Sequence, residues 1–445
     1  MKKNYLFIAL VMMLMAGFTA CSNDDDKNDT TNPAPEPENP APEPENPAKR
    51  GLTDTDTKTT GVFEMTAAQQ AAVTPLNDFS INLFREVSTQ VGADNSTVVS
   101  PLSVAIVLGM LNEGASGNTC GEIQKALGLT DKTKDDINLL MSKIVKGVSA
   151  IDQSVAVSLA NNITVNNMYK LLPQYEKVMA DYYQASAYSL NFSDPTATNT
   201  INNWCYEHTN GVIPKIIDMI SPSAVAYLLD AVYFKGGWTT PFDKAASTPQ
   251  WFAGRGIELI RMACRRGQEK YYENTTFQAL QLPLGNGSYS MTILLPLKKD
   301  GLQDMLKQLN GNVISQLDFK EYDVKTTLPI FRTENEIKLI PILKSLGVVD
   351  AFGPNAKFPD MIQNVTDELY VSNMWQRASL GIDEEGCEGA AITIAIMEVT
   401  CGGEEGQPKN TDYPQRYFTA DHPFLYLISD QETGAIFFIG QFCGK

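Results

Sequence analysis

The segment from residue 387 to residue 396 restricts the possible folds more than any other part of this sequence. Small residues recur at every second position, as in a β-strand with one face of small side chains. The small face carries Cys387, Gly389, Ala391, Thr393 and Ala395, and the opposite face carries Glu388, Ala390, Ile392, Ile394 and Ile396. Such a face suits a strand that inserts between two strands already in place, because bulky side chains would clash there. An ordinary central strand is the alternative interpretation.

Length and composition place the chain among globular proteins. It has 445 residues, of which 43% are hydrophobic and 20% are charged, and this excludes a fully disordered, collagen-like or many-span membrane protein. The net charge of −17 argues against nucleic-acid binding, because phosphate recognition requires a basic face. We therefore expect no nucleic-acid partner.

The sequence lacks the usual patterns of catalytic and metal-binding sites. His208 and His422 are its two histidines, and neither has a nucleophile beside it. No G-x-S-x-G, H-E-x-x-H or C-x-x-C pattern is present. We expect a protein that is not an enzyme and that needs no metal or cofactor. Its cysteines after Cys21 are expected to be mostly buried, free thiols.

Residues 1–20 are expected to be a lipoprotein signal peptide. Lys2 and Lys3 precede an apolar run, 5–19, that is too short to cross a bilayer as a helix. The run leads into Gly17-Phe18-Thr19-Ala20-Cys21, which resembles the lipobox of bacterial lipoproteins. In that motif the cysteine is lipidated, so Cys21 is the expected lipidation site. An ordinary secretory signal with an incidental cysteine is the alternative.

Residues 21–60 are expected to form an acidic tether rich in proline and glutamate. The repeat Asn-Pro-Ala-Pro-Glu-Pro-Glu occupies 32–38 and again 39–45, and proline at every second position favours polyproline II. At ~3.1 Å per residue, a tether from 22 to about 50 spans roughly 80–90 Å. The acidic segment 22–26 resembles the tag that sends some gram-negative lipoproteins to the outer face, although a merely solvated charge run is possible. We expect an outer-membrane lipoprotein that is exposed at the cell surface.

Residues 61–445 are expected to fold as one domain of the α+β class. Strand signals are strongest late in the chain, at 289–295, and at 424–428, which is expected to pair with 436–439. Helix signals dominate the early part. Helices early and strands late favour α+β over a regular alternation of strands and helices.

Two helix starts are predicted from capping residues. Thr74 and Pro75 fit the N-cap and first turn of one helix. Thr119 with Glu122 fits a capping box, and Gly128 is expected to end that second helix.

Motifs spread from about residue 75 to residue 443 resemble the serpin family. Each motif is weak alone, but their order makes the resemblance specific. They are Val99–Ser103, Leu108–Leu111, Gly114–Thr119, Ile201–Trp204, Thr209–Gly211, Ala231–Trp238, Phe242–Asp243, Leu328–Phe331, Leu346–Phe352, Phe418–Phe424 and Thr433–Gly440.

The resemblance implies a serpin fold of three β-sheets and about nine helices, with an exposed reactive-centre loop above the body. It also implies a suicide-substrate inhibitor of serine endopeptidases. A protease cleaves the loop and is acylated, and the loop then inserts as a new strand of the central sheet and traps the acyl-enzyme. The uncleaved form is a kinetic trap rather than the free-energy minimum.

The family's functional positions transfer to this sequence by alignment of the motifs. The hinge that enters the sheet first comprises Glu384, Glu385, Gly386, Cys387, Glu388, Gly389, Ala390 and Ala391. Ser100, Pro101 and Ser103 correspond to the shutter beneath the opening sheet, and Trp204 to the breach at its top. Gln376 stands where many members have a shutter histidine, and its amide can still donate and accept. Cys387 replaces the usual threonine or serine and is small enough to be buried.

Loop length predicts the reactive bond. In inhibitory members the chain length from the position of Glu384 to the cleaved bond is nearly constant, and here it ends at Thr400–Cys401. Met397 and Val399 are alternative positions. Lys409 suits trypsin-like proteases, but it adds about 30 Å of slack, enough to leave a protease undistorted.

The side chains near this bond indicate the class of target. We expect elastase-like or subtilisin-like serine proteases, with papain-like cysteine proteases as additional targets, and a monomeric inhibitor. A bond between Cys387 and Cys401 would hinder insertion, and two free thiols are the preferred alternative. The rival function is a non-inhibitory serpin fold that serves as a surface binding protein. The small residues at 389–391 favour inhibition, because non-inhibitory relatives tend to have charged or bulky groups or proline in the hinge.

Overall fold

The computed structural model describes residues 65–254, 256–363, 369–388 and 413–444. These residues form nine α-helices: α1 (Ala67–Val91), α2 (Pro101–Gly114), α3 (Gly117–Ala126), α4 (Lys134–Ile151), α5 (Pro173–Tyr183), α6 (Thr196–His208), α7 (Leu302–Gln308), α8 (Gly311–Ser315) and α9 (Leu339–Ser345). Two short 3-10 helices, η2 (Lys244–Ala246) and η3 (Asp350–Phe352), accompany them.

The described strands are β1 (Thr97–Val99), β2 (Ala156–Asn166), β3 (Ser186–Leu190), β4 (Ala226–Gly237), β5 (Thr248–Gly254), β6 (Gly256–Glu273), β7 (Phe277–Leu284), β8 (Tyr289–Pro296), β9 (Lys320–Pro329), β10 (Phe331–Lys338), β11 (Trp375–Ile382), β12 (Gly386–Glu388), β13 (Gln415–Thr419), β14 (Phe424–Asp430) and β15 (Ile436–Phe442). The mixture of helices and sheets confirms the predicted α+β class.

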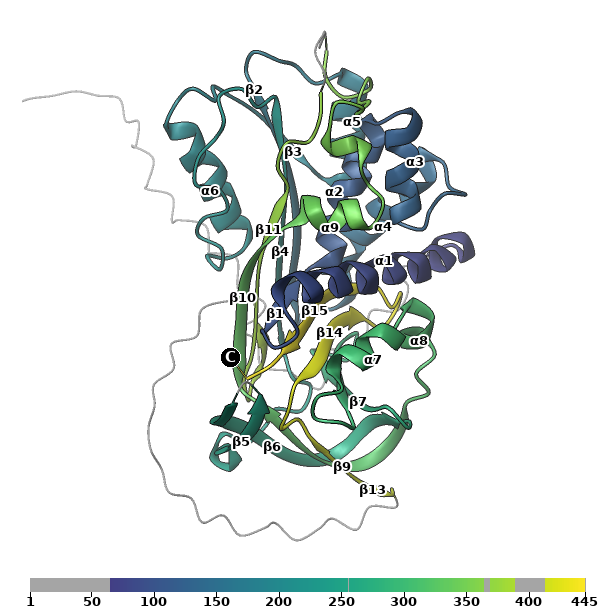
Figure 1. Cartoon of the computed structure of the whole chain (residues 1–445), viewed down its shortest axis with the longest axis vertical. Helices are drawn as coiled ribbons and strands as arrows, with labels where there is room; N and C mark the ends of the chain where they lie inside the picture. The colour runs from purple at the N-terminus through teal and green to yellow at the C-terminus, as the bar shows by residue number, and fades with distance from the viewer. Residues whose placement is uncertain (1–64, 255, 364–368, 389–412, 445) are drawn as a thin grey trace, which may run out of the picture. The chain divides into compact units, whose positions relative to one another are not determined.

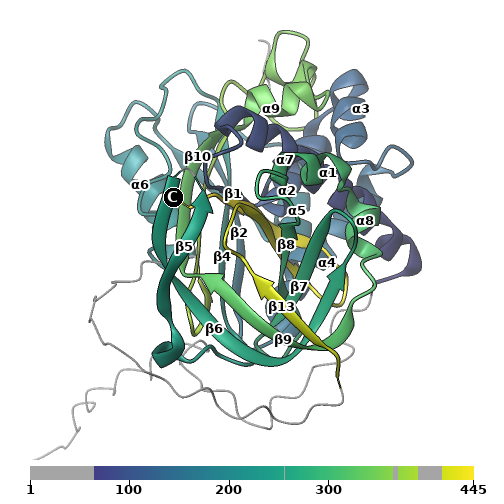
Figure 2. The ribbon, with the colours of Figure 1, turned by 60° about the horizontal axis from the view of Figure 1, so that its bottom comes forward.

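The strands in the described part of the chain join into two hydrogen-bonded sheets. The central sheet has the order β10-β11-β12-β4-β2-β3. The second sheet follows the path β1-β15-β14-β8-β7-β6-β9-β13, with β5 also paired to β6. Three separate sheets were expected. The 18-residue strand β6 pairs with β5 and β9 and, at its end, with β7. It therefore joins two of the expected sheets into one. Figure 2 shows β5, β6, β9 and β13 side by side.

Helices cover both faces of the central sheet (Figure 1). On one face, α2 packs against β4, and the large hydrophobic core lies between this sheet, the helices and the second sheet. On the other face, α6 packs against β2 and β4 over a smaller cluster that includes Ile201, Trp204 and Leu229. Burial of apolar side chains on both faces explains why this sheet has few exposed hydrophobic positions.

Both predicted helix starts are wrong. The first helix begins at Ala67, because Thr66 and Gln69 form a complete capping box upstream, and Pro75 lies inside α1. The helix predicted to start at Thr119 begins at Gly117, with Ser116 as its N-cap residue and no side-chain capping bond. The helix does end just before Gly128, which has a positive φ of 70°.

The predicted late strands are confirmed. β8 contains the expected segment 289–295, and β14 pairs antiparallel with β15. No helix among the described residues is both long enough and apolar enough to cross a membrane.

Candidate functional site

The first part of the predicted hinge is a short strand inside the central sheet. β12 lies between β11 and β4 and is antiparallel to both. Glu388 pairs with Gly381 of β11 and with Lys235 of β4, and Cys387 pairs with Ile382 and Gly236. The hinge has therefore begun to occupy the position of an added central strand.

An acidic turn reverses the chain between β11 and β12. One oxygen of Asp383 accepts hydrogen bonds from the backbone N–H groups of Glu385 at 2.8 Å and Gly386 at 3.0 Å. The backbone N–H of Asp383 in turn donates to the carbonyl of Gly386 at 3.0 Å. A side chain of this type stabilises tight turns by replacing a backbone acceptor. The sequence Asp-Glu-Glu-Gly thus supplies its own reversal.

Trp238 is the tryptophan that holds this turn. Its indole Nε1–H donates to the carbonyl of Asp383 at 2.8 Å, and its backbone N–H donates to the carbonyl of Glu385 at 2.9 Å. Phe242 adds a third bond, from its backbone N–H to the carbonyl of Glu384 at 2.8 Å. Trp238 is almost fully buried, so these bonds are shielded from water.

Trp204, which was expected at the breach, lies elsewhere. It is on α6, in the smaller hydrophobic cluster, and stacks on His208 with ring centroids 4.7 Å apart. The tryptophan that lies beside the hinge is instead Trp238, which directly follows the Lys235-Gly236-Gly237 segment that pairs with the hinge. That segment lies within Ala231–Trp238, one of the motifs that resemble the serpin family. The sequence therefore already contained a signal for this tryptophan.

Three cations from separate elements bind the acidic side chains of the hinge. Arg261 of β6 lies 3.1 Å from Glu384, and Lys244 of η2 lies 2.5 Å from Glu385. Lys235 of β4 lies 3.0 Å from Glu388, which also accepts a hydrogen bond from the hydroxyl of Tyr233. The contact at Lys244 is exposed and contributes little, whereas the side chains of Glu384 and Glu388 are 8% and 17% exposed.

The small residues of the hinge match the space available between the strands. Cys387 is a free thiol, 1% exposed, and burial raises its pKa well above the usual value. A Cβ atom at Gly386 would lie 2.4 Å from the carbonyl oxygen of Gly236. Glycine is therefore required for the close approach of β12 to β4.

A cavity of about 410 Å³ continues beyond β12 along the central sheet. It is lined by β4 and β11 on its two sides, by the start of α2, and by the linker from α6 to β4. Both strands extend past the three residues of β12 by several residues. The described structure thus contains a partly filled slot, with a strand at its start and a cavity along the rest.

The shutter residues lie on the inner side of this slot. Ser100 is the N-cap of α2 and Pro101 its first residue, which is why the helix begins there. The amide of Gln376 accepts from the backbone N–H of Ser100 at 2.8 Å and donates to the carbonyl of Ser100 at 3.0 Å. The expectation that Gln376 both donates and accepts is confirmed. Ser103 lines the cavity beside them.

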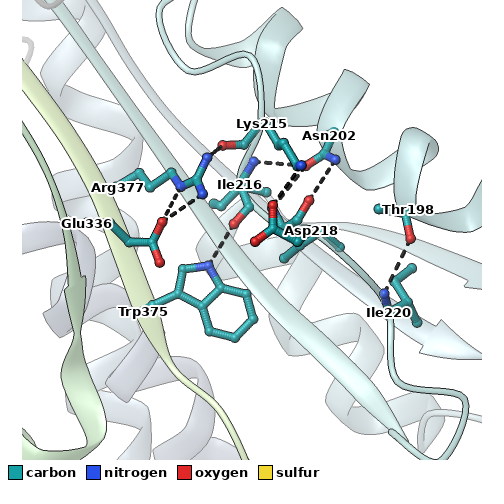
Figure 3. A network of polar contacts seen from close by, with 10 residues as sticks. Thr198, Asn202, Lys215, Ile216, Asp218, Ile220, Glu336, Trp375 and Arg377 are labelled. Atoms are coloured by element: carbon teal, nitrogen blue, oxygen red, sulfur yellow. Dashed lines mark hydrogen bonds and ion pairs between the residues drawn. The ribbon is translucent and has the colours of Figure 1, made fainter.

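The linker between α6 and β4 is bonded to β11 on the outer side of the slot. The indole of Trp375 donates to the carbonyl of Ile216 at 2.7 Å, and Arg377 donates to the carbonyl of Lys215 (Figure 3). Arg377 is also paired with Glu336 of β10 at 2.7 Å. We call this set of contacts the strap, because it joins a segment leading into β4 to the strand across the slot.

Several predicted site residues lie outside the described residues. These are Cys21, the hinge residues Gly389, Ala390 and Ala391, and the loop residues Met397, Val399, Thr400 and Cys401. Within the described residues, no group of three potential metal ligands comes together.

Sequence and structure comparisons match most of the chain. The family model described as serpin (serine protease inhibitor) matches residues 74–444. An uncharacterized serpin-like protein of Thermococcus kodakarensis is 30% identical over 387 residues, covering 84% of this chain and 85% of that protein. A serine protease inhibitor of Drosophila melanogaster is 30% identical over 356 residues, covering 78% and 91%. The native-state structure of the thermophilic serpin tengpin is 27% identical, with a TM-score of 0.73, and covers 86% of this chain and 95% of that one.

Proposed function

The chain belongs to the serpin family, whose members are generally protease inhibitors rather than catalysts, and on this premise we propose that it is a suicide-substrate inhibitor of serine endopeptidases. One observation carries the proposal. The hinge strand β12 is already paired on both sides, and the cavity beyond it follows the same two strands. A loop that continues from β12 would fill that cavity as a full central strand.

The orientation of Cys387 supports insertion of the rest of the loop. Its side chain is buried on the inner face of the sheet, whereas Glu388 points to the other face and pairs with Lys235. Because side chains alternate along a strand, Gly389 and Ala391 would follow Cys387 on the inner face. The small face of the sequence is thus the face that would enter the core.

The proposed chemistry begins with attack of the protease serine on the carbonyl carbon of Thr400. The peptide bond to Cys401 breaks, Cys401 leaves with a free amino group, and Thr400 becomes the acyl group of an ester on the protease. Insertion then carries this ester to the far end of the sheet before water hydrolyses it. Each new backbone hydrogen bond contributes on the order of 1 kcal/mol, and burial of apolar side chains adds to this.

Loop length and side-chain chemistry define the proposed targets. Thr400–Cys401 is the proposed reactive bond, with Met397 and Val399 as alternative positions. These residues suit the small or medium apolar pockets of elastase-like and subtilisin-like enzymes, and papain-like cysteine proteases are additional targets. We also propose that the inhibitor is a monomer held at the outer membrane by a lipid on Cys21 and displayed at the cell surface by the tether.

The rival function, a non-inhibitory surface binding protein, is separated from inhibition by one gel experiment. The full chain is mixed with a panel of elastase-like, subtilisin-like and papain-like proteases. Inhibition gives a covalent complex that survives SDS, together with a heat-stable cleaved form. Cleavage of the loop by every protease without any such complex would support the rival.

A matched pair of variants tests insertion itself. Ala391→Arg would place a charge on the inner face of the new strand, and burial of an unpaired charge is costly. Ala390→Arg adds the same side chain on the opposite face, the face of Glu388 and Lys235. We expect the first variant to be cleaved as a substrate and the second to keep trapping. Covalent trapping by Ala391→Arg equal to that of the unmodified chain would contradict the assigned orientation.

A further inference from the structure

A buried ion pair on β6 has no role in the account given so far. The guanidinium of Arg265 lies 2.5 Å from the carboxylate of Glu269, and the two side chains are 7% and 5% exposed. Burial opposes both charges, since it lowers the pKa of Arg265 and raises the pKa of Glu269. Replacing such a pair by apolar residues often leaves stability unchanged or increases it. The pair therefore requires an explanation other than stability.

A glycine between the two charged residues makes room for their contact. Arg265, Gly267 and Glu269 lie on the same face of β6, because side chains alternate along a strand. A Cβ atom at Gly267 would already contact the Glu269 carboxylate, at 3.7 Å. A larger side chain at this position would stand between the two charges. Gly267 thus allows the arginine to extend along the strand to its partner.

The guanidinium of Arg265 lies over the ring of Phe242. Its Cζ atom is 4.6 Å from the centre of the ring, which is within the range of a cation–π contact. Two of its nitrogens, Nε and Nη1, have no hydrogen-bond acceptor among the described residues. Arg265 is therefore held by Glu269 at its tip and by the aromatic ring along its face. Such a contact is stronger when it is shielded from water than when it is exposed.

Phe242 connects this ion pair to the hinge turn. It is 4% exposed, its ring packs edge-on against that of Trp238, and its backbone N–H donates to the carbonyl of Glu384 at 2.8 Å. The same face of β6 also carries Arg261, which lies 3.1 Å from the side chain of Glu384. Two arginines of one strand therefore act on one hinge residue, Arg261 directly and Arg265 through Phe242.

We propose that Arg265 is a positioning residue for the hinge: held by Glu269, it fixes the ring of Phe242 and so keeps the hinge turn paired in the central sheet. We call Arg265, Glu269 and Phe242 the hinge clamp. The proposal rests on the inhibitory function proposed above, because a hinge that is already paired begins insertion sooner after cleavage. The clamp then acts on the partition between trapping and release of the protease, and not on the stability of the fold.

The test removes both charges of the clamp at once. In Arg265→Met/Glu269→Leu no unpaired charge is left in the core, so we expect the chain to fold and its urea midpoint to be unchanged or higher. The thiol of Cys387, buried in the paired hinge, is expected to react with iodoacetamide at pH 8 about tenfold faster than in the unmodified chain. On the protease panel this variant should give more cleaved inhibitor and less covalent complex. A purely structural role would change stability and hinge exposure together.

Two further variants separate the ring from the charges and supply a control. Phe242→Leu keeps the ion pair, should speed alkylation of Cys387 by a similar factor, and should add little to the double replacement, because both changes remove the same contact. Arg266→Met is the matched control. This neighbouring arginine is on the opposite face of β6 and pairs with Asp323 at 2.7 Å. Its removal is expected to leave the alkylation rate of Cys387 unchanged.

Three results would overturn the hinge clamp. They are an unchanged alkylation rate of Cys387 in the double replacement, full additivity with Phe242→Leu, and an equally fast reaction in Arg266→Met, which would indicate a general loosening of β6. The unmodified chain is tested for covalent complexes in parallel. If it forms none while the alkylation rates are as expected, the inhibitory function is contradicted and the clamp is retained.

Discussion

Replacing Gly386 with alanine should release the hinge from the sheet. A Cβ atom at this position would lie 2.4 Å from the carbonyl oxygen of Gly236 and 2.8 Å from the Cα of Gly237. Both are backbone atoms of β4, so they cannot rotate away as a flexible side chain would. The clash is relieved when β12 separates from β4, which breaks the pairing of Cys387 and Glu388 with that strand.

The size of the effect follows from the cost of overpacking. An extra methyl group in a closely packed site typically costs about 1–3 kcal/mol. A difference of 1.4 kcal/mol corresponds to a factor of ten in an equilibrium constant. The equilibrium constant between the paired and the released hinge should therefore shift roughly 5- to 150-fold toward release. Release also exposes the thiol of Cys387, which is 1% exposed in the paired state.

Alkylation of Cys387 measures this shift directly. The native chain and the variant are treated with iodoacetamide at pH 8, and the modified peptide is quantified by mass spectrometry over time. Cys387 of Gly386→Ala is expected to react faster by the same factor. The variant should also give more cleaved inhibitor and less covalent complex, because a released hinge delays insertion.

Gly121→Ala is the matched control. Gly121 lies in α3, and nothing is within 4 Å of the position that its Cβ atom would take. This variant should behave as the unmodified chain in both assays. If Gly386→Ala also left the alkylation rate and the yield of complex unchanged, the close approach of β12 and β4 would not be what holds the hinge.

Three further predictions concern the strap, the anchor and the loop. Trp375→Phe removes the 2.7 Å hydrogen bond to Ile216 but keeps an aromatic ring. We expect the free energy of unfolding of the uncleaved form in urea to fall by about 1 kcal/mol, and the variant to trap protease faster. Unchanged trapping rates would exclude the strap as a restraint on insertion. Cys21→Ser should move the protein from the membrane fraction to the soluble fraction, and continued membrane association would disprove lipid anchoring at this residue. The small C-terminal fragment released from a denatured protease complex should begin at Cys401 by mass spectrometry; a fragment beginning after Lys409 would disprove the length argument.

Much of the hinge was predictable from the sequence, because the alternation of small and larger side chains along a strand depends only on neighbouring residues. Small residues at every second position indicated an inserting strand, and the structure places Cys387 on the buried face and Glu388 on the other. The donor and acceptor roles of Gln376 followed from the chemistry of its side chain. The pairing of β14 with β15 was also predictable, since a short turn joins two strongly strand-forming segments.

Short sequence motifs gave wrong predictions for one helix start and for the tryptophan beside the hinge, because another residue or motif takes that role in the structure. Pro75 suits a first helical turn, but the complete capping box of Thr66 and Gln69 lies upstream and sets the start of α1. Trp204 was assigned to the breach, whereas Trp238 carries the bonds to the hinge. Residue type alone could not distinguish these two tryptophans, because the fold decides which of them lies beside the hinge.

The sequence by itself determined the fold class, the family and the character of the inserting strand, because these depend on residue order and short-range periodicity. The tertiary structure decided which cations meet the hinge: Arg261, Lys244 and Lys235 come from three different elements and converge on one acidic segment. It also decided that the carboxyl group of Asp230 is shielded from solvent beside the cavity that follows β12. Such contacts join residues more than a hundred positions apart, and their energies depend on burial and distance, which arise when the sheet is assembled.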